Sequence, residues 1–255
     1  MYDYLQNSSV RRVLKTLNIP VPVPPILKRK GNAFSDAELQ TKKITVAGNE
    51  TEFSHEIQKL LNDKCDVATI YDAQIDGLVV SCVGMQTIED LEDLFTSIKN
   101  TVNKIAANGR IVIVSKLDTS SVTSFTVQRY IDWFSRALSK EIGGKKGVTV
   151  NLLKITNDDV QAYEVVKAAT FFLSDKSPFI TGQVVELNKA DGQNISSQEN
   201  LLQGKIAIVT GGARGIGAAA AKVLHREGAT VIIVDVPQAA DDANALAQEI
   251  DGDAK

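Results

Sequence analysis

The chain is poor in the residues that build metal centres, disulfide frameworks and nucleic-acid surfaces. Its 255 residues include two cysteines, two histidines and one tryptophan, and the formal net charge is −3. Cys65 and Cys82 match no metal or redox spacing, and we interpret both as reduced core residues. His55 and His225 lie too far apart in sequence to form a local metal motif. Because long runs of lysine or arginine are missing, neither nucleic acid nor an anionic membrane is an expected partner.

The sequence also shows no targeting segment and no membrane-spanning segment. The first twelve residues have no apolar core of signal-peptide length, and prolines interrupt the apolar stretch 19–27, which therefore cannot form a spanning helix. We expect a cytoplasmic protein. Hydrophobic residues make up 44% of the chain and charged residues 23%, globular values that exclude disordered and low-complexity classes.

The N-terminal region predicts a short helix followed by an extended arm. Val10, Leu14 and Leu17 recur at helical spacing and predict an amphipathic helix that ends near Asn18. Four of the six prolines then fall within residues 20–25, where they disfavour a helix. We assign residues 1–40 to this helix and arm.

Apolar runs alternate with helix-length amphipathic segments between residues 41 and 190. Alternation of this kind predicts an α/β domain in which helices cover both faces of a parallel sheet, a three-layer Rossmann-like architecture. The expected strands are Ile44–Ala47, Val67–Ile70, Leu78–Val80, Ile111–Val114, Val148–Leu153 and Val184–Leu187. Among the expected helices are Ile88–Ala107 and Val127–Glu141.

A polar stretch separates this domain from a second, shorter one. Residues 188–203 show no apolar periodicity, and we take 191–203 as a linker. From residue 204 the strand and helix pattern restarts, and 204–255 predict the beginning of a second Rossmann unit that is incomplete. Its expected elements are a strand Lys205–Thr210, a glycine-rich loop Gly211–Gly217, a helix Ala218–Glu227, a strand Thr230–Asp235 and a helix Ala240–Ile250.

The glycine-rich loop is the strongest functional signal in the chain. Residues 210–217 read Thr-Gly-Gly-Ala-Arg-Gly-Ile-Gly, between a β-branched strand and an alanine-rich helix. We expect Gly211 to permit a tight turn, Gly215 to let a pyrophosphate approach the backbone, and Gly217 to allow close helix packing. The helix N-terminus offers free N–H groups to the phosphates. The candidate cofactor-binding residues are Thr210, Gly211, Gly212, Arg214, Gly215, Ile216, Gly217 and Asp235.

Two charged residues bear on the choice of dinucleotide. Asp235, at the end of the second strand, is placed to accept hydrogen bonds from the adenosine ribose and to repel a 2′-phosphate. Arg214 has the opposite tendency, since a guanidinium is a natural phosphate partner, although it could equally lie over the adenine or face solvent. We expect NAD rather than NADP as the cofactor.

The run of residues 204–217 resembles the opening of short-chain dehydrogenases/reductases, in the form Thr-Gly-x-x-x-Gly-x-Gly. It is especially similar to the 3-oxoacyl-acyl-carrier-protein reductases. The resemblance implies hydride transfer from the nicotinamide to a 3-oxoacyl thioester substrate in fatty-acid metabolism. It also implies a homo-oligomer.

Residues 41–190 resemble a copy of the same fold that has lost its nucleotide loop. Residues 43–46, Lys-Ile-Thr-Val, align with 205–208, Lys-Ile-Ala-Ile. The loop differs, because bulky side chains stand at the glycine positions and two carboxylates stand where phosphates would lie. These residues are Asn49, Phe53 and His55, with Glu50 and Glu52. We therefore expect no dinucleotide at this loop.

The later segments of this region resemble the family with its catalytic groups replaced. Residues 76–84 are similar to the strand that ends in Asn-Asn-Ala-Gly, and 179–185 to the closing strand. Residues 109–115 resemble the strand that carries the catalytic serine, which Ser115 matches. Where the family has Tyr-x-x-x-Lys, this sequence has Phe125 and Arg129, and Phe125 has no proton to exchange.

One other pair fits the Tyr-x-x-x-Lys spacing. Tyr163 and Lys167 satisfy it literally, but they precede the intact glycine loop, whereas the family's pair follows its loop. Five tyrosines in a lysine-rich chain also make such a spacing common by chance. We interpret this pair as non-catalytic.

The whole arrangement resembles the N-terminal part of the high-molecular-weight 3-oxoacyl-acyl-carrier-protein reductases, in which a flavodoxin-like domain precedes a ketoreductase domain. On that reading the second domain is truncated after its NAD-binding start, so we expect no turnover by these 255 residues alone. Two alternatives stay open. The chain could be a noncatalytic interaction or regulatory module, or part of a reductase for another carbonyl, such as a short acyl-CoA ester or a secondary alcohol.

Overall fold

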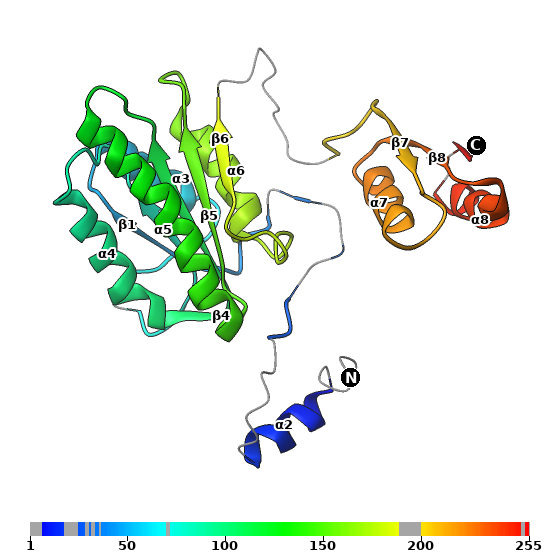
Figure 1. Ribbon diagram of the computed structural model, residues 1–255, viewed down its shortest axis with the longest axis horizontal. Helices are drawn as coiled ribbons and strands as arrows, with labels where there is room; N and C mark the ends of the chain where they lie inside the picture. Colours follow the sequence, from blue (N-terminus) through cyan, green and yellow to red (C-terminus); the bar gives the residue numbers. More distant parts are fainter. Residues whose placement is uncertain are drawn as a thin grey trace. The chain divides into compact units, whose positions relative to one another are not determined.

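The protein is described by a computed structural model that covers residues 7–17, 25–28, 31, 34–35, 37–69, 72–188, 200–250 and 253–254. The chain forms two compact units (Figure 1). The first comprises Met1–Lys30 and Glu38–Asp191, and the second Gly31–Ala37 and Gly192–Lys255. The N-terminal helix is α2 (Ser8–Thr16). Its expected end near Asn18, three of the four arm prolines and most of the linker lie outside the described residues.

The first unit is built on a six-stranded sheet in which every pairing is parallel. The strand order is β2-β1-β3-β4-β5-β6, and its first five positions follow the flavodoxin-like doubly wound order. The strands are β1 (Lys43–Gly48), β2 (Asp66–Val67), β3 (Ile75–Ser81), β4 (Ile105–Lys116), β5 (Thr149–Ile155) and β6 (Val184–Leu187). The predicted parallel α/β fold is therefore confirmed.

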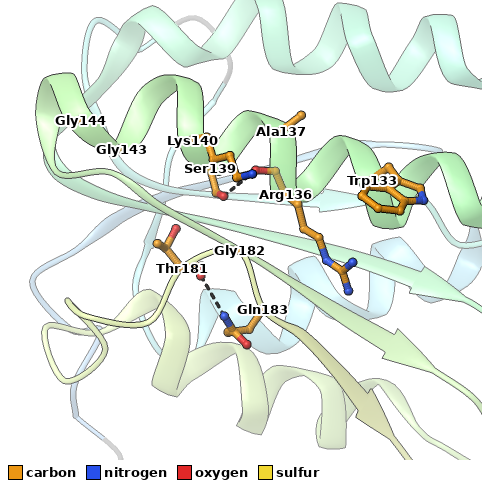
Figure 2. A pocket seen from close by; sticks show the side chains of 10 residues that line it. All are labelled: Trp133, Arg136, Ala137, Ser139, Lys140, Gly143, Gly144, Thr181, Gly182 and Gln183. Atoms are coloured by element: carbon orange, nitrogen blue, oxygen red, sulfur yellow. Dashed lines mark hydrogen bonds between the residues drawn. The ribbon is translucent and has the colours of Figure 1, made fainter.

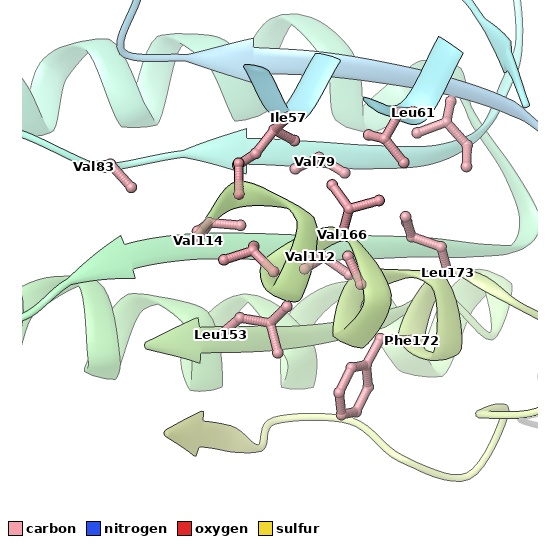
Figure 3. Close-up of a cluster of buried hydrophobic side chains, with 14 of the residues drawn as sticks. Ile57, Leu61, Val79, Val83, Val112, Val114, Leu153, Val166, Phe172 and Leu173 are labelled. Atoms are coloured by element: carbon pink, nitrogen blue, oxygen red, sulfur yellow. The ribbon is translucent and has the colours of Figure 1, made fainter. Parts of the chain in front are cut away.

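Helices cover both faces of this sheet (Figure 1). One face packs against α3 (Glu52–Asn62) and α6 (Ala162–Leu173), the other against α4 (Asp90–Thr101) and α5 (Val122–Lys146). Figure 3 shows the first of these cores, where Ile57 of α3 and Val166 of α6 pack against Val112 and Val114 of β4. Because both faces are buried, the central strands read as continuous apolar runs rather than as alternating ones.

The predicted helix Ile88–Ala107 is wrong at its C-terminal end. Helix α4 ends at Thr101 and, after a short turn of 3-10 helix, η1 (Val102–Lys104), Ile105 already begins β4. Ile105 is buried and pairs with Ile75 of β3. A short apolar run fits helix and strand periodicity alike, so the tertiary pairing decides between them.

The ends of α5 and the extent of β2 also differ from the prediction. Helix α5 begins at Val122 because Ser121 and Ser124 form a reciprocal capping box there, and it ends at Gly147, whose φ is +67°. Strand β2 is confined to Asp66–Val67. Of the residues predicted to extend it, Ile70 lies outside the described part of the chain.

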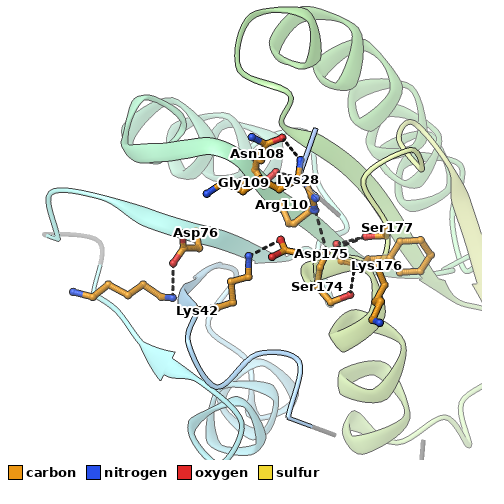
Figure 4. A network of polar contacts seen from close by, with 12 residues as sticks. Lys28, Lys42, Asp76, Asn108, Gly109, Arg110, Ser174, Asp175, Lys176 and Ser177 are labelled. Carbon is orange, nitrogen blue, oxygen red and sulfur yellow. Dashed lines mark hydrogen bonds and ion pairs between the residues drawn. The ribbon is translucent and has the colours of Figure 1, made fainter. Parts of the chain in front are cut away.

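A polar network closes the amino end of the first unit's sheet (Figure 4). Arg110 is fully buried, and its guanidinium donates from Nε to the Ser174 carbonyl at 3.2 Å and from Nη1 to the Asn108 carbonyl at 2.8 Å. Burial lowers the pKa of Arg110, and the carboxylate of Asp175 opposes that shift. Lys42 pairs with the same Asp175 at 2.7 Å. Ligands of open α/β sheets bind at the opposite, carboxyl edge, so this network is a structural feature.

The second unit is a small parallel sheet with helices on one face. Its strands are β7 (Ile206–Thr210), β8 (Thr230–Val234) and β9 (Asp253–Ala254), in the order β7-β8-β9. Its helices are η2 (Pro237–Ala239), α7 (Gly215–Arg226) and α8 (Ala240–Glu249).

The two α-helices of this unit share one core with the sheet. Ala221 of α7 and Leu246 of α8 are buried with Val231 and Ile233 of β8. On the other face of the sheet, Ile206 is 71% and Ile208 66% exposed. In the described ranges, we find no helix with the length and apolar character needed to cross a bilayer.

Candidate functional site

The glycine loop lies between β7 and α7 in a conformation that glycine adopts readily. Gly211 has a φ of +63° and Gly215 a φ of +59°, both in the left-handed region that side chains disfavour. A Cβ atom built on either would have no atom within 4 Å. The space beside these two glycines is therefore open to a ligand.

Two other glycines allow the loop to close on itself. A Cβ on Gly217 would lie 2.1 Å from the carbonyl oxygen of Gly211, and a Cβ on Gly212 would lie 2.8 Å from that of Val209. Real Cβ atoms essentially never approach backbone so closely. The first turn of α7 therefore packs directly on the turn that follows β7.

The N-terminus of α7 has no side-chain cap. The helix begins at Gly215, three residues earlier than predicted, and Arg214 at the N-cap makes no side-chain hydrogen bond to it. Ile216 in the first turn is 91% exposed. Because the first N–H groups of a helix have no intrahelical acceptor, this end presents donors and a positive dipole end to an anion.

Asp235 follows β8 and is tied to the glycine loop. Its Oδ2 accepts the N–H of Ala213 at 2.9 Å and its Oδ1 accepts the N–H of Val236 at 2.8 Å. The bond from Ala213, together with that from Val236 and the charge of Arg214, holds the pKa of Asp235 below its usual value. A carboxylate that is charged at neutral pH thus stands beside the loop.

Arg214 forms an ion pair that the sequence did not indicate. Its Nε lies 3.3 Å from Oδ2 of Asp242, in the first turn of α8. Asp241 and Asp242 both occupy that turn, where acidic residues are common because they favour the helix dipole. Because acidic residues are common at this position, the sequence gives no sign that Asp242 contacts Arg214. The contact is evident only in the folded structure.

The eight predicted cofactor-binding residues occupy one continuous loop and the neighbouring strand end. They are Thr210, Gly211, Gly212, Arg214, Gly215, Ile216, Gly217 and Asp235. Such a cradle fits a pyrophosphate beside the α7 N-terminus and a ribose beside Asp235.

The corresponding loop of the first unit is closed by its own side chains. Thr51 caps α3 by accepting the N–H of Ser54 at 3.2 Å, and the Ser54 hydroxyl accepts the N–H of Thr51 at 2.7 Å. The Ser54 hydroxyl also contacts the Asn49 carbonyl at 2.8 Å. Glu52 adds a negative charge in the first turn. Side chains therefore occupy two of the N–H donors at the start of α3, those of Thr51 and Ser54.

Removing this cap is expected to weaken the first unit. Thr51→Ala deletes the hydroxyl that accepts the Ser54 N–H, and we expect the free energy of unfolding to fall by about 1 kcal/mol. Trp133 lies in α5, and as the chain's one tryptophan it reports by fluorescence on the first unit alone during urea unfolding. Glu50→Gln, beside it but outside the capping box, serves as control and leaves stability within about 0.5 kcal/mol. Equal midpoints for the two variants contradict the capping role.

The position that resembles the catalytic serine is buried. Ser115 at the end of β4 is 0% exposed, and its Oγ has no hydrogen-bond partner among the residues that the structure describes. Its register partner on β5 is Lys154, whose Nζ lies 2.9 Å from Oδ2 of Asp132 on α5. Arg129 approaches the same Asp132 oxygen at 3.5 Å. The buried Lys154–Asp132 ion pair therefore lies beside Ser115 in the sheet.

The other candidates in the first unit lie on two helices that cover opposite faces of the sheet. Phe125 is 46% exposed on α5. Tyr163 and Lys167 lie on α6, on the other side of the sheet, with the Lys167 Nζ 5.9 Å from the centre of the Tyr163 ring. This placement does not bring the Tyr163 pair to the residue that resembles the catalytic serine.

An open groove of about 710 Å³ lies between α5 and the loop that precedes β6 (Figure 2). Its lining includes Trp133, with the Arg136 guanidinium stacked 5.6 Å from the ring centre, and Gly182 on the facing loop. It contains neither Ser115 nor any residue of the glycine loop.

Neither the cysteines nor the histidines belong to the glycine loop. Cys82 is buried and Cys65 half-buried, both as free thiols, and burial raises the pKa of Cys65 to about 11. His55 on α3 and His225 on α7 are exposed.

Comparison with known proteins finds sequence relatives for the last part of the chain. Residues 205–255 match the family model of the short chain dehydrogenases. Tropinone reductase-like 1 of Erythroxylum coca is 44% identical over 61 residues, which cover 24% of this chain and 22% of that protein. The sex determination protein tasselseed-2 of Zea mays is 54% identical over 46 residues, 18% of this chain and 14% of that protein.

A third relative and one solved structure complete the comparison. The (+)-borneol dehydrogenase 1 of Salvia officinalis is 51% identical over 41 residues, 16% of each chain. A crystal structure of a short-chain dehydrogenase/reductase from Brucella melitensis has a TM-score of 0.49 and 15% identity, over 59% of this chain and 96% of its own. The chain spans about a fifth or less of the length of the three sequence relatives. Residues 205–255 therefore resemble the short-chain dehydrogenase/reductase family.

Proposed function

We propose that the second unit binds the adenosine and pyrophosphate part of NAD, and that the protein is an oxidoreductase transferring hydride with that cofactor. The observation that carries the proposal is the uncapped N-terminus of α7 inside a loop whose Gly217 contacts the Gly211 backbone. When bound, the cofactor supplies the hydride. The chain's own residues hold the phosphates at the first turn of α7 and the ribose at Asp235.

The charge at Asp235 favours NAD over NADP. A carboxylate that remains ionised at neutral pH accepts hydrogen bonds from ribose hydroxyls but repels a 2′-phosphate. We expect the chain to bind NAD at least about tenfold more tightly than NADP, a difference of about 1.4 kcal/mol. Isothermal titration with each nucleotide measures this ratio. Equal affinities, or tighter binding of NADP, contradict the assignment.

The substrate class that we favour is a 3-oxoacyl thioester carried by acyl carrier protein. Support comes from the similarity of residues 204–217 to reductases of that class. The reaction moves a hydride from the nicotinamide to the C3 carbonyl carbon and a proton to its oxygen. By the same resemblance we propose that the protein acts as a homo-oligomer. The names of the plant relatives favour a second candidate, a reductase or dehydrogenase for a different ketone or secondary alcohol.

Kinetics separate these substrate classes. The product of the complete reading frame, whatever its length, is assayed with NADH on acetoacetyl-acyl-carrier-protein and acetoacetyl-CoA, and with NAD on a cyclic secondary alcohol. We expect the highest kcat/KM for the carrier-protein thioester. A higher kcat/KM for the secondary alcohol supports the second candidate instead.

We propose a noncatalytic role for the first unit. Its helix α3 is capped internally, its Ser115 is buried, and Phe125 stands where the family has a proton-exchanging tyrosine. At these positions the first unit has no exposed proton-transfer group of the family's kind, so we expect the 255 residues by themselves to turn over neither thioester nor alcohol. A measurable NADH oxidation rate with the isolated chain contradicts this.

A further inference from the structure

The guanidinium of Arg214, in the glycine loop, forms an ion pair with Asp242. Arg214 is 69% exposed, and its Nε lies 3.3 Å from Oδ2 of Asp242, which is 52% exposed. The two residues come from different elements, the N-cap of α7 and the first turn of α8. The contact therefore depends on how α7 and α8 pack on the same face of the sheet.

This ion pair lies beside the carboxylate at the end of β8. Asp235 accepts the N–H of Ala213, the residue before Arg214, at 2.9 Å. Arg214 is also close enough for its charge to favour the ionised form of Asp235. One cation and two carboxylates thus meet at the corner of the loop where the ribose hydroxyls of a bound dinucleotide would lie.

The two carboxylates have different consequences for a 2′-phosphate. Asp235 repels such a phosphate directly. Asp242 instead pairs with Arg214, whose guanidinium has the geometry to bind a phosphate. To contact a 2′-phosphate, Arg214 must first release the carboxylate of Asp242. That carboxylate then remains nearby and repels the phosphate, because both are negatively charged. NAD carries no group at that position and requires no such exchange.

We propose that Asp242 is a specificity-determining residue that makes the glycine loop discriminate against NADP by holding Arg214. The proposal rests on the proposed function, because it concerns the same nucleotide site. It assigns the preference for NAD to two carboxylates with separate roles, Asp235 at the ribose and Asp242 at the arginine.

Titration of the full 255-residue chain with NAD and NADP, which differ only in the 2′-phosphate, tests the proposal. Asp242→Asn keeps the size of the side chain and removes its charge. We expect the affinity for NADP to rise about tenfold and that for NAD to change less than twofold. Asp241→Asn is the matched control, since it removes the same charge from the same helical turn and has no ion pair with Arg214 among the contacts described. It should leave the ratio of affinities unchanged.

A double variant separates release of the arginine from a general change of charge. In Arg214→Gln with Asp242→Asn, the gain in NADP affinity should disappear, because no guanidinium is left to meet the phosphate. An unchanged ratio in Asp242→Asn, an equal gain in Asp241→Asn, or a gain that persists in the double variant each overturns the role of Asp242. If the unsubstituted chain binds neither nucleotide, the proposed function itself fails. Thermal unfolding followed by circular dichroism confirms that each variant is folded.

Discussion

Replacing Gly217 by alanine is expected to weaken NAD binding by the chain strongly. The added Cβ would lie 2.1 Å from the Gly211 carbonyl oxygen and 2.8 Å from its carbonyl carbon. Both are backbone atoms, so no side-chain rotation can relieve the clash, and the loop must move away from α7. Such overpacking costs about 1–3 kcal/mol, and displaced N–H donors no longer face the pyrophosphate. We expect NAD affinity to fall by about tenfold or more in calorimetric titration.

Gly204→Ala provides the matched control for this variant. Gly204 also has a positive φ, +74°, but a Cβ there would meet no atom within 4 Å. The control thus introduces backbone strain without a clash, outside the loop, and should bind NAD as tightly as the unsubstituted chain. If Gly217→Ala retains the affinity of this control, the close packing at Gly217 does not shape the nucleotide site.

Breaking the buried Lys154–Asp132 ion pair of the first unit is expected to give a large loss of stability. Lys154 and Asp132 are 8% and 7% exposed, and the Lys154 Nζ contacts both carboxylate oxygens, at 2.9 and 3.2 Å. Lys154→Met leaves Asp132 buried with only the weaker contact to Arg129, at 3.5 Å. Removing one partner of a buried pair costs about 3–5 kcal/mol, because the other charge is left uncompensated. Urea unfolding followed by Trp133 fluorescence measures this loss.

The double variant distinguishes charge compensation from packing. Lys154→Met combined with Asp132→Leu removes both charges and keeps apolar volume, so it should be more stable than either single variant. The interpretation of this pair as mutually compensating is contradicted if either single variant lowers the free energy of unfolding by less than about 1 kcal/mol. It is also contradicted if the loss in the double variant equals the sum of the two single losses.

Local features of the sequence predicted the glycine loop and the order of elements well. A strand, a run of glycines and an alanine-rich helix are neighbours in the chain, so their spacing alone places residues 210–217. Likewise the apolar runs predicted the parallel sheet, because strands buried on both faces are apolar throughout. The end of α4 was missed because the apolar side chains of 102–105 suit a helix and a strand equally, and pairing with β3 decides.

The sequence pattern could not predict contacts between residues that are far apart in the chain. Asp242 reads as an ordinary acidic residue at the start of a helix, and its contact with Arg214 depends on the packing of α7 and α8. The Lys154–Asp132 pair was missed for a similar reason, since Lys154 interrupts no visible motif and its burial follows from its place beside Ser115 in the sheet. Thr51 gave a local signal, as a helix-capping residue, and a search for capping boxes with serine at the third position would have found it.

The difference between the two loops is tested most directly by the stoichiometry of NAD binding. The uncapped α7 and the internally capped α3 predict that the 255-residue chain binds one NAD, and that Gly217→Ala weakens this binding by about tenfold or more. Isothermal titration calorimetry gives the stoichiometry and the affinity together. A stoichiometry of two, or one site that survives Gly217→Ala unchanged, would mean that the first unit binds the nucleotide and would contradict the assignment.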